Sequence, residues 1–113
     1  MQIVRGAVTL GELRQMAAGM FGDLVKAVVD VERELIAVDA ELHSDLEALL
    51  LQDGSNQKSL WGINLYPEMA GDDFIEFDSM INVRPSQDNR SRGVESKELR
   101  ERIIAVVQKR VAG

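Results

Sequence analysis

The chain contains no cysteine and only one histidine, His43, among its 113 residues. Without cysteine it can form no disulfide, no thiolate metal site and no thiol nucleophile. One histidine also leaves almost no material for Ser–His or Cys–His catalysis, in which a nucleophile must lie beside an imidazole base. We therefore expect a fold held together by an apolar core, and the sequence indicates no cofactor.

Aromatic residues and long apolar runs are scarce as well. Three Phe, one Trp and one Tyr offer few platforms on which single-stranded nucleic acid could stack. The net charge of −6 argues against a general binder of duplex DNA. No stretch approaches the roughly 18 apolar residues of a membrane span, and the first thirty residues do not resemble a signal peptide. We expect one cytoplasmic domain over residues 1–113, without a nucleic-acid or membrane partner.

The charge is unevenly distributed along the chain. Acidic residues outnumber basic ones nine to two in residues 23–53, whereas basic residues outnumber acidic ones eight to four in residues 84–113. This asymmetry leaves room for a local anion site in the second region, and for head-to-tail association of copies of the chain.

Helical patterns lie towards both ends of the chain. Thr9 and Glu12 fit a capping box, and the apolar residues that follow recur at helical spacing, which predicts a helix over residues 10–21. Ser96 is a suitable N-cap for a second helix over residues 96–111. Acidic residues near the start of that helix and basic ones near its end match its dipole.

Apolar and polar residues alternate between the two helices, as in half-buried strands. Residues 25–38 alternate until Leu35 and Ile36, two adjacent apolar residues that break the alternation. Either a bulge at this point or a turn near Arg33 would account for the break. Residues 60–66 and 74–84 alternate too, and residues 2–4 can form a short edge strand. These patterns predict a mostly antiparallel sheet.

Residues 41–52 fit two structures. As a strand, Leu42 and Leu46 face one way and His43 the other, whereas as a helix the segment has a capping box from Ser44 to Glu47. Three consecutive leucines do not discriminate between the two. We favour the strand, because residues 53–55 read Asp-Gly-Ser before an alternating run, which is typical of a hairpin turn.

The combined pattern predicts an α+β two-layer sandwich. About four main strands follow one another in meander order, and the helices at 10–21 and 96–111 cover one face of the sheet. The other face would be open and polar. It would carry the following side chains: His43, Asp45, Glu47, Asn64, Tyr66, Glu76, Asp78, Asn82 and Arg84.

The best candidate binding surface joins this open face to the loop of residues 84–93. Guanidinium and amide groups are donors suited to an anion, and the loop leads to a helix N-terminus, where the dipole favours negative charge. A structural loop whose arginines pair with the acidic residues of 23–53 is the alternative. The candidate ligand-binding or anion-binding residues are Asn64, Asp78, Asn82, Arg84, Gln87, Asn89, Arg90 and Arg92.

A weaker candidate is a metal site formed by His43, Asp45 and Glu47. On a strand these three residues share a face and could bind a divalent ion, although a solvated strand face is the favoured explanation of the pattern. If the segment is a helix, the three residues no longer share a face, so we favour no metal site.

Several segments together resemble a prokaryotic family of short proteins classed as a domain of unknown function. They include LWGINLYPE and FDSMINVRPSQDNRSRGVE, and the run from residue 60 to residue 95 is the most specific part. The resemblance implies a small bacterial or archaeal protein, and it carries over no catalytic residue.

The sequence favours a binding module over an enzyme, because no nucleophile can be paired with a base. We expect a small anionic ligand or a protein partner on the polar face and the 84–93 loop, with a second copy of the chain as one such partner. The alternative is a small metal-dependent or anion-processing enzyme that uses His43, Asp45 and Glu47.

Overall fold

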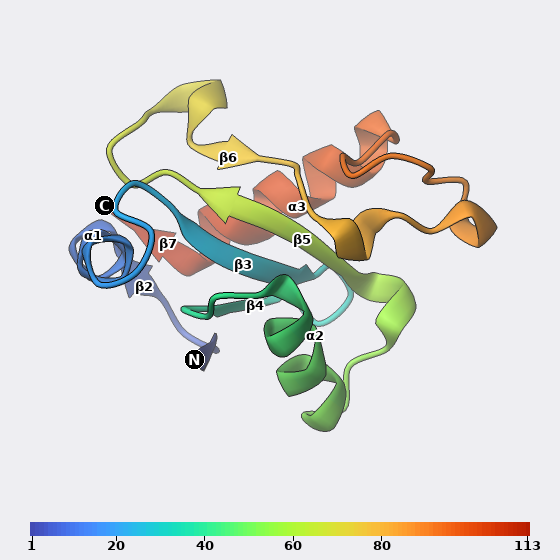
Figure 1. The fold of residues 1–113 in the computed structure, drawn as a ribbon, viewed down its shortest axis with the longest axis horizontal. Helices are drawn as coiled ribbons and strands as arrows, with labels where there is room; N and C mark the ends of the chain where they lie inside the picture. Colours follow the sequence, from blue (N-terminus) through green and yellow to red (C-terminus); the bar gives the residue numbers. More distant parts are fainter.

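The computed structural model describes all 113 residues and is built around a five-stranded antiparallel sheet (Figure 1). Its strands are β1 (Gln2–Val4), β3 (Val25–Asp30), β4 (Leu35–Val38), β5 (Leu60–Leu65) and β6 (Ile75–Glu76), in the spatial order β1-β4-β3-β5-β6. A separate parallel pair joins β2 (Val8–Thr9) to β7 (Val111–Ala112). The α+β class and the antiparallel sheet are confirmed, as is the edge strand at residues 2–4.

The predicted strand over residues 25–38 is a hairpin, formed by β3 and β4. Asp30 Oδ1 accepts hydrogen bonds from the backbone N–H groups of Glu32 (3.0 Å) and Arg33 (2.9 Å), an arrangement typical of turns. The predicted turn near Arg33 is therefore confirmed, and the alternative prediction of a bulge is wrong. Because β5 pairs with β3 rather than β4, the predicted meander order is also wrong.

Helices α1 (Leu10–Ala18) and α3 (Lys97–Arg110) pack on one face of the sheet. In Figure 1, α3 lies behind the sheet. The capping box forms, with Thr9 Oγ1 accepting from the N–H of Glu12 at 3.0 Å, and Ser96 caps α3. Leu13 and Ile103 from these helices are fully buried against the sheet. Both predicted helices are confirmed, although α1 ends three residues early.

The opposite face is covered by a third helix, α2 (His43–Gln52), which lies in front of the sheet in Figure 1. The prediction of a strand over residues 41–52 is wrong. Leu46 and Leu50, one helical turn apart, are both fully buried and pack with Val28, Ala37 and Leu60 in a second, smaller core. Burial of this leucine pair outweighs the hairpin signal of residues 53–55, and the helices lie on both faces of the sheet.

The predicted strand over residues 74–84 is reduced to β6. Beyond it the chain forms short 3-10 turns, η3 (Met80–Asn82) and η4 (Pro85–Gln87), while η1 (Gln57–Ser59) and η2 (Gly71–Asp73) precede β5 and β6. A Cβ atom on Gly62 of β5 would lie 2.5 Å from Cβ of Ser79, so this segment packs directly on the sheet. The polar face is therefore open only in part. None of the helices is both long and apolar enough to cross a bilayer.

Candidate functional site

The predicted loop residue Arg84 is held by backbone groups of its own chain. Its guanidinium donates to the carbonyl oxygens of Ile81 (2.9 Å), Gln57 (3.1 Å) and Leu60. It also lies 3.5 Å from a carboxylate oxygen of Glu47 and above the ring of Trp61. This arrangement fixes three chain segments together.

Asn82 and Asn89 are both buried and bond to the backbone. The amide of Asn82 accepts from the N–H of Gly62 (2.8 Å) and donates to its carbonyl oxygen (2.9 Å), as a neighbouring strand would. Asn89 donates to the carbonyl oxygens of Asn82 and Gly93 and accepts from the N–H of Glu95. These two side chains explain how an irregular segment closes the edge of β5.

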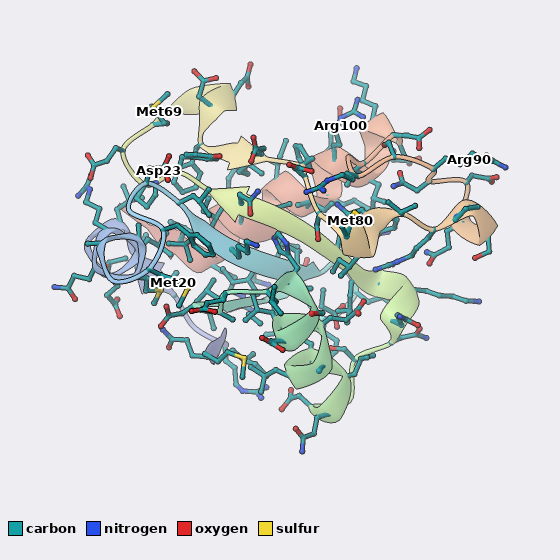
Figure 2. All side chains as sticks on the ribbon, viewed as in Figure 1. Met20, Asp23, Met69, Met80, Arg90 and Arg100 are labelled. Carbon is teal, nitrogen blue, oxygen red and sulfur yellow. The ribbon has the colours of Figure 1, made fainter.

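The remaining loop residues lie nearer the surface. Gln87 donates to the carbonyl oxygen of Lys58, and Arg92 pairs with Asp78 at 2.6 Å. Arg90 is exposed at the periphery of the molecule (Figure 2), and its guanidinium contacts no acceptor. Ligand binding by the 84–93 loop stays a prediction.

His43, Asp45 and Glu47 do not come together as a metal site. His43 is directed onto the sheet, where Nε2 lies 2.8 Å from the carbonyl oxygen of Ile63, while Asp45 is exposed and Glu47 faces Arg84. No group of three His, Asp or Glu residues in the structure is placed to hold an ion. The helix separates the side chains that a strand would have aligned.

A different polar cluster forms where α2 begins, on the part of the sheet that α2 leaves uncovered. Lys26 of β3, Asn64 of β5 and Glu76 of β6 lie side by side as register partners across three strands. His43 and Asp78 lie close enough to this row that Lys26 and Asp78 both affect the pKa of His43. We call the following residues the Asn64 cluster: Lys26, His43, Asn64, Tyr66, Glu76 and Asp78.

Asn64 is 6 % exposed, and its Oδ1 has no hydrogen-bond partner. The amide cannot be turned round, because Nδ2 donates to Glu76 Oε1 (2.9 Å) and to the carbonyl oxygen of Asp78 (3.4 Å), both of which only accept. A buried polar atom without a partner costs about 1–3 kcal/mol and is rare in native proteins. The unpaired Oδ1 can therefore accept a hydrogen bond from a donor that approaches the cluster.

His43 supplies a second acceptor. Its Nε2 faces the carbonyl oxygen of Ile63, which only accepts, so Nε2 carries the hydrogen and Nδ1 of the neutral ring does not. Burial lowers the pKa of His43, an effect that the Ile63 carbonyl opposes and Lys26 reinforces. The neutral ring thus presents a bare nitrogen near Asn64, and the Asn64 side chain in turn favours the charged ring.

Tyr66 and Glu76 extend the cluster towards the surface. The Tyr66 hydroxyl donates to Glu76 Oε1 at 3.0 Å, and burial, followed by this contact, raises the pKa of Tyr66. Both residues line a hollow of about 330 Å³ that also includes Asp72 and Asp73. No residue of the Asn64 cluster lines the larger hollows, so the cluster is an open surface rather than a deep pocket.

Two of the eight predicted binding residues, Asn64 and Asp78, belong to this cluster, and the structure adds His43 from the metal set. Lys26, Tyr66 and Glu76 were not among the predicted binding residues. Tyr66 and Glu76 stand on the predicted polar face, and Lys26 has the parity of the polar positions of residues 25–34. The sequence thus placed each of these three residues on a polar face. Only the pairing of β5 with β3 shows that Lys26 lies beside the other two.

The chain belongs to the protein family described as "Protein of unknown function (DUF5674)", whose sequence pattern matches residues 2–110. The resemblance predicted a family of unknown function, and this prediction is confirmed. Neither a curated protein nor a solved structure matches the chain.

Proposed function

We propose that this member of the DUF5674 family binds a small ligand that combines an N–H or O–H donor with a negatively charged group, and that the Asn64 cluster holds it. The observation that carries the proposal is the vacant Oδ1 of Asn64, a fixed and buried acceptor. A ligand donor at this position removes the cost of an unpaired buried atom, so the same contact contributes affinity and selects for donors.

The negatively charged group of the ligand has two partners nearby. Lys26 is half-buried, and its ammonium lies 5.1 Å from the ring centre of Phe21 and in no ion pair, which leaves its charge available. Helix α2 begins at His43 without a side-chain cap, and the backbone N–H groups of His43 and Ser44 have no partner, whereas that of Asp45 donates to the carbonyl oxygen of Leu42. Two unpaired N–H groups at a helix N-terminus favour an anion. A molecule that carries both a donor and an anionic group, such as an amino acid, could therefore bind Asn64 Oδ1 with the donor and Lys26 with the anionic group.

The proposal favours binding over catalysis. The neutral His43 offers a base, yet no serine or threonine hydroxyl belongs to the Asn64 cluster. Glu76 and Asp78 accept hydrogen bonds from Asn64 and Arg92, which fits carboxylates that orient neighbouring groups.

A direct test is titration of ¹⁵N-labelled protein with the twenty amino acids, with acetate as the anion alone and methylammonium as the donor alone. We expect at least one amino acid to shift the amide signals of His43, Asn64 and Glu76 at a tenfold lower concentration than acetate or methylammonium. The proposal is abandoned if no amino acid shifts these signals, or if the simple ions do so equally well.

Variants separate the two halves of the site. Asn64→Leu should weaken binding of the best probe at least tenfold, and Lys26→Gln should weaken it by removing the positive charge. Asn56→Ala is the matched control, because Asn56 caps η1, away from the cluster. Amide spectra of each variant establish that it is folded, and unchanged affinity of both folded variants would contradict the proposed site.

A further inference from the structure

A groove runs between β6 and α3, on the side of the sheet away from the Asn64 cluster. Two hollows of about 390 and 470 Å³ share Gly71, Ile75, Ile104 and Gln108 as lining residues, so they form one continuous depression. Met69 and Arg100, labelled in Figure 2, line its two ends. We call this depression the β6–α3 groove.

One wall of the groove is an unpaired strand edge. β6 is the outermost strand and pairs only with β5. The carbonyl oxygen of Phe74 accepts from the N–H of Tyr66, so by alternation the N–H and C=O of Ile75 point away from β5. Such an edge is a template on which an extended chain can add a strand.

The floor of the groove is apolar. Nine of the twelve residues that line the hollow of about 390 Å³ are hydrophobic, among them Phe74, Ile75 and Val107. Ile75 and Ile104 are only partly buried, so they can still bury surface against a partner. Seating one bulky apolar side chain there removes apolar surface from water and so favours binding.

The rim near Met69 is acidic. Asp72 lines the groove, and Asp73 follows it in the chain and lines the adjoining hollow. Both are exposed, and neither forms an ion pair or a side-chain hydrogen bond. Arg100, at the other end, directs its guanidinium to the carbonyl oxygens of Val94 (2.6 Å) and Glu95 (3.1 Å). A basic group on the occupant would therefore find free partners beside the apolar floor.

From the free edge, the apolar floor and the acidic rim, we propose that the β6–α3 groove binds an extended segment of a partner protein that carries a bulky apolar residue beside a lysine or arginine. The segment adds to β6 through the backbone of Ile75. Its apolar side chain enters the groove and its basic side chain reaches Asp72 and Asp73. This surface adjoins the hollow beside Tyr66 and Glu76, with which it shares Asp72 and Ile75, but it contains neither Asn64 nor Lys26.

The test uses two acetylated eight-residue peptides, one that alternates leucine with lysine and one that alternates leucine with glutamate. We expect the lysine peptide to bind at least tenfold more tightly, to shift the amide signals of Ile75 and Ile104, and to slow hydrogen exchange at the Ile75 amide. The Asn64 signals should not move. Equal binding of the two peptides, or no effect at Ile75, would overturn the proposal.

Substitutions identify the groove and its occupant. Ile104→Glu should abolish binding, and Asp72→Lys combined with Asp73→Lys should reverse the peptide preference, whereas Val83→Thr, an exposed apolar position elsewhere, should change nothing. Ultracentrifugation supplies the remaining outcome. If the protein is a dimer that Ile104→Glu converts to a monomer, the occupant is a second copy, and the proposal of a separate partner fails.

Discussion

On the face of the sheet that α1 and α3 cover, buried contacts join apolar side chains such as Leu13, Ile63 and Ile103. The opposite face has a smaller apolar core under α2, next to which Asn82 and Ser79 are buried with their hydrogen bonds made. The first face can accept many apolar residues of suitable volume, because apolar packing is not directional. The second requires particular side chains at particular positions, and for that reason it is where specific chemistry can arise.

The largest effect should follow from a cavity in the apolar face. Ile63→Ala removes most of a fully buried side chain and should lower the free energy of unfolding by about 2–5 kcal/mol. Urea denaturation followed by circular dichroism measures the change. A loss below about 1 kcal/mol would show that this face does not dominate stability.

A slightly smaller loss should result from removing one amide on the polar face. Asn82→Ala deletes three hydrogen bonds and leaves the N–H and C=O of Gly62 unpaired, which should cost about 2–4 kcal/mol. Gln108→Ala, at an exposed position, is the control. If Asn82→Ala unfolds no more easily than the control, hydrogen bonding does not close this face.

The close approach at Gly62 offers a sharper comparison of the same face. Gly62→Ala places a methyl group 2.5 Å from Ser79 Cβ and should cost about 1–3 kcal/mol through overpacking. Ser79→Gly removes that atom, so Gly62→Ala should cost less in a Ser79→Gly background. A double-mutant cycle measures the coupling, and additive effects would refute the contact.

The smallest effect concerns the pH dependence of stability. Burial holds the pKa of His43 below its ordinary value of 6.5 in the folded protein, so below about pH 6.5 the unfolded chain binds the proton more readily. Stability should therefore fall as the pH drops from 7.5 through 6.5 towards the lowered pKa.

Urea titrations at pH 7.5 and 5.5 measure this difference, and His43→Gln should reduce it. The carboxyl groups of Glu34, Asp53 and Glu95 have lowered pKa values, through hydrogen bonds to Lys109, Arg33 and the Arg90 N–H respectively, so they titrate below this window. An equal pH dependence in His43→Gln would show that the imidazole is not responsible.

The sequence was sufficient for elements whose signals are local. The capping residues Thr9 and Ser96 specify the starts of α1 and α3. The alternation of residues 60–66 predicts β5, and Pro67, which follows directly, predicts where the strand ends. In residues 41–52 the local signals conflict, and burial of Leu46 and Leu50 against β3 and β4 decides the outcome. No window of the sequence contains that information.

The candidate site was predicted in part for the same reason. Asn64 and Asp78 were recognised because polar residues stood at even spacing on alternating segments. Asn82 has the same spacing, yet its side-chain amide already bonds to the N–H and C=O of Gly62, as the backbone of a neighbouring strand would. Spacing identifies residues that share a face, and only the fold shows which of them already have partners.

The pairing of β2 with β7 has a kinetic consequence. It joins Val8 to Val111, and Arg110 reinforces it by donating to the carbonyl oxygen of Arg5, 105 residues away along the chain. Contacts of such high contact order require almost the whole chain to be closed into a loop, so they should form after the folding transition state. Substitutions at Val8 or Val111 would then accelerate unfolding and leave the rate of folding nearly unchanged.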